Sequence, residues 1–247
     1  SKISMNKRIK EKSGTPFKTL FESLRDPDLN LEDLINAPDL FKAYPILKNI
    51  GITLDLRNTQ GASYSPKHKY IAIGENVAAS DLKTTLLHEV QHAVQIMEGH
   101  ARGGHPILFD ASVNPNQNLQ DALLKVRQRN KIQAIYRGAD MIREIGDTKG
   151  AIKQHKEADK QTNYDAYRLL AGEIESRLTE RRLEMNEKQR SETPPWKTLA
   201  RMLRDEGLIE GNEKPEDFVI EWYGKGTAGS VRYAPPVSDI SEEEAKS

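Results

Sequence analysis

Two histidines one helical turn apart, with a glutamate beside the first, form the most informative chemical pattern in the chain. Residues 84–99 read TTLLHEVQHAVQIMEG, so His88, Glu89 and His92 follow the spacing H-E-x-x-H. Residues four apart are neighbours on a helix, so both imidazoles could supply corners of one tetrahedral zinc site. Glu89 would then be the catalytic general base that takes the proton of the attacking water, as in metalloproteases.

A helix has to present these side chains, and the surrounding sequence predicts one. Its apolar residues fall on one stripe at helical spacing: Leu82, Leu86, Val90, Ala93, Val94 and Met97. Ser80 suits the N-cap, and Gly99 suits the position just after the helix. Because His88 and His92 lie roughly opposite the stripe, we expect the helix to pack on a core and offer both imidazoles to a cleft. The competing interpretation is an ordinary solvated amphipathic helix.

The third metal ligand does not come from the most familiar local spacing. In one arrangement a third histidine follows six residues after the second, with a glycine between them. Here Gln95 stands at the glycine position and Glu98 at the histidine position, and Glu98 lies off the histidines' face. His100 and His105 follow in EGHARGGHP and could be ligands. A Gly-rich loop more often carries residues that shape the backbone. The loop at residues 99–106 is also a candidate substrate wall, in which Arg102 either binds substrate or ties the loop down.

A carboxylate from a later helix is the other route to a third ligand. The segment YRLLAGEIESRL contains Glu173 and Glu175, which are two residues apart and point to different sides of a helix. Both flank the packing face, so periodicity does not choose between them. Tyr164 and Tyr167 precede them and could donate a hydrogen bond at the site or pack as ordinary helix residues.

The rest of the chain predicts an α+β fold, mainly helical, with a small sheet against the H-E-x-x-H helix. Residues 50–57 and 69–74 alternate as strands, either as a hairpin or as neighbours, around a Gly-, Ser- and Pro-rich turn. Helices are predicted at 17–24, 30–41, 118–145 and 149–185, with a break at Pro194–Pro195 and a short helix after it. We expect a flexible arm at 1–15, a metallopeptidase domain at 16–190 and a short helix with a coil tail at 191–247.

The composition excludes some classes of partner and of catalytic site. The 247 residues carry 37 basic and 37 acidic side chains, so nothing indicates bulk attraction to nucleic acid or to a membrane. The absence of cysteine excludes thiol catalysis and zinc sites built on cysteine. No secretion signal and no membrane-spanning run is evident, which is compatible with an intracellular protein.

Two motif blocks in combination resemble a known family. LLHEVQHAVQIMEGHARGG, followed downstream by YRLLAGEIESR and preceded by LFKAYPILKNIGITLDL, is similar to a zincin-like metallopeptidase domain of the large polyvalent proteins of phages and mobile elements. The resemblance covers about residues 28 to 185. His100 departs from it, since relatives carry an aromatic residue there.

The resemblance implies a gluzincin-type site in which His88, His92 and a downstream glutamate bind Zn²⁺. Such families often have Ser or Ala three residues after the ligand, which selects Glu173 with Ser176 over Glu175. It further implies a zinc endopeptidase with a protein or peptide substrate, belonging to a larger polyprotein or a virion. The expected location is then the cytoplasm of a bacterial host or the inside of a virion. Two alternatives stay open: a non-catalytic structural or interaction module, and a zinc amidase that acts on cell-wall peptide.

Overall fold

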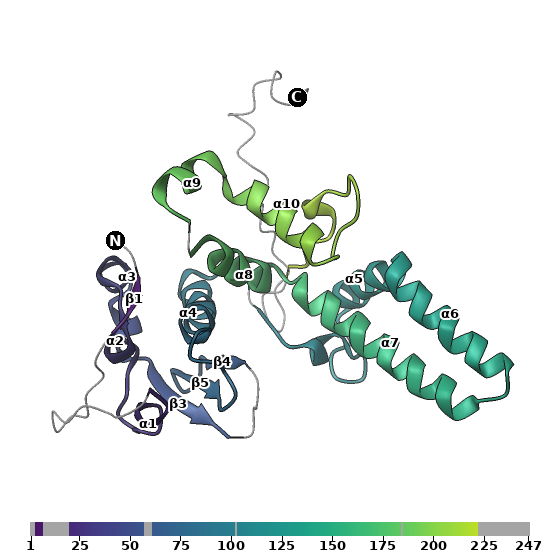
Figure 1. Ribbon diagram of the computed structural model, residues 1–247, viewed down its shortest axis with the longest axis horizontal. Helices are drawn as coiled ribbons and strands as arrows, with labels where there is room; N and C mark the ends of the chain where they lie inside the picture. The colour runs from purple at the N-terminus through teal and green to yellow at the C-terminus, as the bar shows by residue number, and fades with distance from the viewer. Residues whose placement is uncertain (1–2, 7–19, 57–60, 102, 184, 222–247) are drawn as a thin grey trace, which may run out of the picture. The chain divides into compact units, whose positions relative to one another are not determined.

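The computed structural model describes residues 3–6, 20–56, 61–101, 103–183 and 185–221 and has an α+β architecture in which helices predominate (Figure 1). The predicted α+β class with mainly helical content is confirmed. The chain divides into two compact units, unit 1 with Ser1–His100 and Thr179–Glu184, and unit 2 with Ala101–Leu178 and Met185–Ser247. The predicted boundaries after residues 15 and 190 stay predictions. Among the described helices, none is both long and apolar enough to pass through a bilayer.

Unit 1 is built around a three-stranded sheet with the order β3-β5-β4. β3 (Gly51–Asp55) runs parallel to β5 (Tyr70–Gly74), and β4 (Ala62–Ser65) runs antiparallel to β5. The two predicted strands are therefore neighbours, and the hairpin alternative is wrong because they are parallel. A third strand lies in the segment predicted as a turn. β4 was missed because its sequence, ASYS, is small and polar, which an edge strand tolerates.

Helix α4 (Leu82–Glu98) covers the sheet and shares its core. Leu86, Val90 and Ala93 are buried in the same hydrophobic cluster as Ile71 and Ile73 of β5. The helix begins one residue later than predicted, since Asp81 and not Ser80 is the N-cap. It ends as predicted at Gly99, whose φ of 71° lies in the left-handed region that glycine adopts readily. The predicted stripe is buried from Leu82 to Val94, whereas its last member, Met97, is exposed near the end of the helix.

The segment before the sheet is more divided than its sequence indicates. The predicted helix at 30–41 is α2 (Leu31–Leu34), β2 (Ile35–Asn36) and α3 (Pro38–Ala43), followed by the 3-10 turn η1 (Pro45–Asn49). β2 interrupts the helix because it pairs antiparallel with β1 (Ser4–Met5), a contact with a remote segment. β1 itself lies within the predicted arm. Of the predicted helix at 17–24, the structure describes α1 (Leu20–Ser23), and residues 17–19 lie outside the described part.

Unit 2 is helical, and its longest elements pair as an antiparallel hairpin of α6 and α7 (Figure 1). Its elements are η2 (Pro106–Phe109), α5 (Gln117–Arg127), α6 (Asn130–Glu144), α7 (Thr148–Arg168), α9 (Glu187–Glu192), α10 (Pro195–Asp205) and η3 (Pro215–Asp217), together with α8 (Ala171–Leu183) as far as Leu178. A separate hydrophobic cluster joins α5, α8 and α10 through Leu119, Ile174 and Leu203. The predicted coil tail from residue 222 onward lies outside the described residues.

Each predicted long helix is in fact two helices. The stretch 118–145 is broken between α5 and α6, and the stretch 149–185 is broken between α7 and α8 at Leu169 and Leu170. The second break has a long-range cause. Ile220 donates its N–H to the Leu169 carbonyl at 2.8 Å, and Ala171 donates its N–H to the Ile220 carbonyl at 2.7 Å. This bridge diverts backbone groups from the helical ladder and starts α8 two residues before Glu173.

Candidate metal centre

The two histidines on α4 lie close together, edge to face. Their ring centroids are 4.8 Å apart, with an interplanar angle of 80°. Both side chains are half-buried. The buried apolar stripe of α4 fixes the helix on the sheet, so residues on its other side, His88 and His92 among them, are held in position.

Each imidazole has a hydrogen-bonding partner at Nδ1. The Nδ1 of His88 lies 2.7 Å from Oε1 of Glu180 on α8, and that of His92 lies 3.0 Å from Oε1 of Gln95. A carboxylate oxygen only accepts, so the proton of neutral His88 belongs on Nδ1. The amide oxygen of Gln95, which is fully buried, gives His92 the same arrangement. In both rings Nε2 is then the nitrogen suited to a metal.

Glu173 is a buried carboxylate, 2% exposed, at the start of α8. Its Oε1 accepts the backbone N–H of Gly104 at 2.8 Å, and its Oε2 accepts the hydroxyl of Tyr167 at 2.7 Å. Both oxygens are therefore oriented by a donor. Gly104 allows the close approach because an added Cβ would lie 2.4 Å from Cδ1 of Leu108 and 2.8 Å from Cδ1 of Leu170.

The three predicted ligands form one group. Ligand atoms of His88, His92 and Glu173 all lie within 4.8 Å of one another. Helix α8, which carries Glu173, is one continuous helix whose residues from Thr179 onward belong to unit 1 with the histidines. Two imidazole nitrogens and one carboxylate oxygen are a ligand set that zinc binds in catalytic sites. The group could hold a metal ion of this kind.

The chain also supplies the orienting partners that such a site requires. Metal-bound histidines usually donate their second ring N–H to a carboxylate or carbonyl, and ligating carboxylates are themselves hydrogen-bonded. Glu180 and Gln95 match the first requirement, and Gly104 and Tyr167 match the second. The residues therefore fit a metal ion beyond the three ligands themselves.

Glu89, the predicted general base, is buried on α4 and is 6% exposed. It directly follows His88 in the sequence, as H-E-x-x-H requires. A charged side chain is seldom buried to this extent without a role or a partner. Its position beside the first histidine is consistent with the predicted function.

Other candidates are not part of the group. Glu175 is half-buried on α8 and is not among the grouped ligand atoms. His100 is exposed and lies 3.4 Å from Glu98, and the Nδ1 of His105 accepts the backbone N–H of Ile107 at 3.2 Å. Glu98, the last residue of α4, accepts a hydrogen bond from Tyr44. Arg102, considered for substrate binding, lies outside the described residues.

A charged cluster in unit 2 lies near Glu173. Arg177, one turn later on α8, donates to Glu206 and to the carbonyl of Arg168, while Arg168 itself pairs with Glu206 at 2.6 Å. Burial lowers the pKa of Arg177 from its usual value, whereas the carboxylates of Glu206 and Glu173 act in the opposite direction. Arg177 thus places a counter-charge near the Glu173 carboxylate.

Of the four orienting residues, the sequence analysis considered Tyr167 as a possible donor at the site and missed the roles of Gln95, Glu180 and Gly104. Gln95 follows His92 by three residues, so helical spacing alone could have indicated it. Glu180 follows Glu173 by two helical turns and could have been found once Glu173 was chosen. Tyr167 was noted, but its bond to Glu173 spans the break between α7 and α8. Gly104 gave no signal, since its contact depends on the folded loop.

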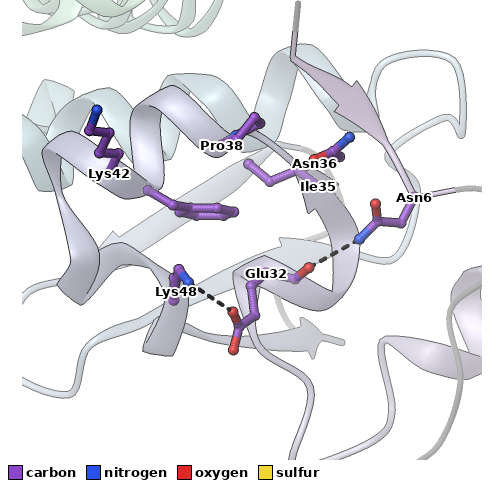
Figure 2. Close-up of a pocket in the computed structure, with 8 residues that line it drawn as sticks. Asn6, Glu32, Ile35, Asn36, Pro38, Lys42 and Lys48 are labelled. Atoms are coloured by element: carbon purple, nitrogen blue, oxygen red, sulfur yellow. Dashed lines mark hydrogen bonds and ion pairs between the residues drawn. The ribbon is translucent and has the colours of Figure 1, made fainter. Parts of the chain in front are cut away.

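Unit 1 also contains a shallow cavity of about 410 Å³ away from the histidines (Figure 2). It is lined by Asn6, Glu32, Ile35, Asn36, Pro38, Phe41, Lys42 and Lys48. The Asn6 amide donates to the carbonyl of Glu32 at 3.0 Å, and Lys48 pairs with the Glu32 carboxylate at 3.8 Å. None of the predicted site residues is in this lining.

Comparisons of the chain with protein-family models, with curated proteins and with solved structures gave no match. The function is therefore inferred from the residues and their geometry.

Proposed function

We propose that the protein is a zinc-dependent endopeptidase with a zincin-like site, in which His88, His92 and Glu173 bind the metal. The observation that carries the proposal is the convergence of these three side chains, whose ligand atoms all lie within 4.8 Å of one another. A chance H-E-x-x-H on a solvated helix has no reason to meet a buried carboxylate from a distant helix. The proposal also explains why Glu173 is buried and hydrogen-bonded at both oxygens.

When bound, zinc would polarise the scissile carbonyl and acidify the attacking water. The remaining steps belong to the chain. Glu89 takes the proton of the water and delivers it to the leaving amine, so the nitrogen departs as a neutral amine. Tyr167 and the Gly104 amide keep Glu173 in place, and Gln95 keeps His92 in place, so the ligand geometry is preformed.

The association with a phage or mobile element is the second part of the proposal. It is supported by the resemblance of the combined H-E-x-x-H and GEIES blocks to the metallopeptidase domain of polyvalent proteins. The substrate class that fits is a protein or peptide.

The test compares zinc-loaded wild type with Glu89→Gln on a library of peptides cut from denatured bacterial proteins. Mass spectrometry counts new peptide termini. We expect wild type to produce new termini, a zinc chelator to abolish them, and Glu89→Gln to lower the rate by about 100-fold or more. Glu187→Gln, an exposed change at the start of α9, is the matched control and should retain the wild-type rate.

Two outcomes would overturn the proposal. One is a folded, zinc-loaded wild type that produces no new termini. The other is Glu89→Gln with wild-type activity. A parallel sample with purified bacterial cell wall separates the amidase alternative, because release of wall peptide without cleavage of the library would replace the endopeptidase assignment.

A further inference from the structure

The contact between His88 and Glu180 joins residues 92 positions apart. Their side chains are 15% and 31% exposed, so the pair is largely shielded from water. Glu180 lies on α8 seven residues after Glu173, and seven residues are close to two full helical turns. The same side of α8 therefore carries both Glu173 and Glu180.

We propose that Glu180 is a positioning residue for the metal centre. It accepts the Nδ1–H of His88, holds the ring in one tautomer and one orientation, and so presents Nε2 to the metal. This inference rests on the proposed zinc site. It assigns Glu180 no contact with metal or substrate.

The two histidines differ in how they are oriented, and this difference makes the proposal specific. His92 bonds to Gln95, a neutral amide three residues away on its own helix. His88 bonds to a charged carboxylate on another helix. A charge-assisted hydrogen bond is stronger than a neutral one and raises the basicity of the imidazole as a ligand. Loss of the Glu180 charge should therefore affect His88 and leave His92 unchanged.

A merely structural ion pair between α4 and α8 would give a different result. Such a pair would contribute to the free energy of unfolding but would not set which nitrogen of His88 carries the proton. The ring tautomer is thus the readout that separates the two roles. It is measured in metal-free protein at a pH above the histidine titration range, so both rings are neutral.

The experiment uses the full chain as wild type, Glu180→Leu, Glu180→Asp and the same-helix control Glu175→Gln. Glu180→Leu removes the acceptor, whereas a glutamine at this position would still accept the Nδ1–H of His88, as Gln95 does for His92. Long-range ¹H–¹⁵N NMR of the histidine rings reports the tautomers, and chelator competition reports the affinity for Zn²⁺. We expect the Nδ1–H form of His88 in wild type, a shift toward the Nε2–H form in Glu180→Leu, and zinc affinity lower by about 10- to 100-fold in that variant. Glu175→Gln should match wild type.

The outcomes separate this inference from the proposed function. A folded wild type that binds no zinc overturns the zinc site itself. A wild type that binds zinc, with Glu180→Leu unchanged in affinity and in His88 tautomer, overturns the role of Glu180 alone. Glu180→Asp, whose carboxylate is one methylene short, should lose affinity in the same direction. If Glu180→Leu does not fold, the affinity of Glu180→Asp still tests the proposal, because wild-type affinity in that variant would contradict it.

Discussion

The histidine side and the glutamate side of the candidate metal centre are held in different ways. His92 takes its orienting bond from Gln95, three residues away, and both histidines project from one helix fixed by its own apolar stripe. Glu173 takes its bonds from Tyr167 beyond a helix break and from Gly104, 69 residues away. The histidine side is local to α4 except for the bond between His88 and Glu180, which lies on α8, whereas the glutamate side is assembled by the folding of unit 2.

This difference predicts which substitutions should weaken metal binding at the proposed site. Substitutions near the histidines but outside their contacts should have little effect on metal binding. Substitutions that leave every ligand intact but disturb the surroundings of Glu173 should weaken metal binding.

Tyr167→Phe should have the largest effect of the three. It removes the hydroxyl that donates to Glu173 Oε2 at 2.7 Å while keeping the ring. Without that bond the carboxylate loses one of its orienting donors, and we expect affinity for Zn²⁺ to fall by about 10- to 100-fold. Chelator competition measures it. Tyr164→Phe, at an exposed tyrosine in the same helix, is the control and should retain wild-type affinity; equal affinities in the two variants would remove the distinction between the sides.

Gly104→Ala should have a smaller effect on affinity and a measurable effect on stability. The new Cβ would collide with Cδ1 of Leu108 and of Leu170, so the loop must move and its N–H must withdraw from Glu173. We expect about 1–2 kcal/mol lower stability and about tenfold weaker zinc binding.

The matched control for this loop is Gly51→Ala in β3, where the added Cβ meets its nearest neighbour, Cβ of Tyr70, at an ordinary 3.6 Å. It should leave zinc affinity unchanged. If Gly104→Ala binds zinc as wild type does, the loop does not hold Glu173.

Tyr44→Phe should have the smallest effect of the three substitutions. It should change only the stability and its dependence on alkaline pH, and leave zinc binding unchanged. The hydrogen bond from Tyr44 to Glu98 raises the pKa of the phenol above its usual value of 10.0. The unfolded chain therefore releases the phenol proton at lower pH than the folded chain does. The contribution of this hydrogen bond to the free energy of unfolding is complete below about pH 10 and is lost as pH rises through the folded pKa.

Urea unfolding between about pH 8 and pH 11 measures this contribution. Wild type should lose stability relative to Tyr44→Phe over the alkaline part of that range. A constant difference between the two proteins would show that the phenol has no raised pKa.

The same contrast explains what could be read from the sequence. The H-E-x-x-H spacing, the stripe of α4 and its end at Gly99 are local patterns, and the structure has α4 close to its predicted bounds. Strands β3 and β5 alternate apolar residues and were likewise predicted. Each of these features depends on residues within a few positions of one another.

Features that depend on remote partners were missed. The break between α7 and α8 comes from the bridge to Ile220, and β2 interrupts a predicted helix because it pairs with β1. Helical periodicity could not decide between Glu173 and Glu175 as the third ligand, because both flank one packing face. The resemblance to a metallopeptidase family selected Glu173, and the structure brings Glu173 together with the histidines.

Zinc stoichiometry is the most direct test of the central claim, that His88, His92 and Glu173 form one metal site. Wild type, His88→Ala, Glu173→Gln and Glu175→Gln are loaded with zinc, dialysed and analysed for metal, with circular dichroism to confirm folding. We predict about one zinc per chain in wild type and in Glu175→Gln, and background levels in His88→Ala and Glu173→Gln. Folded wild type without zinc after loading, or Glu173→Gln with full zinc content, would contradict the account.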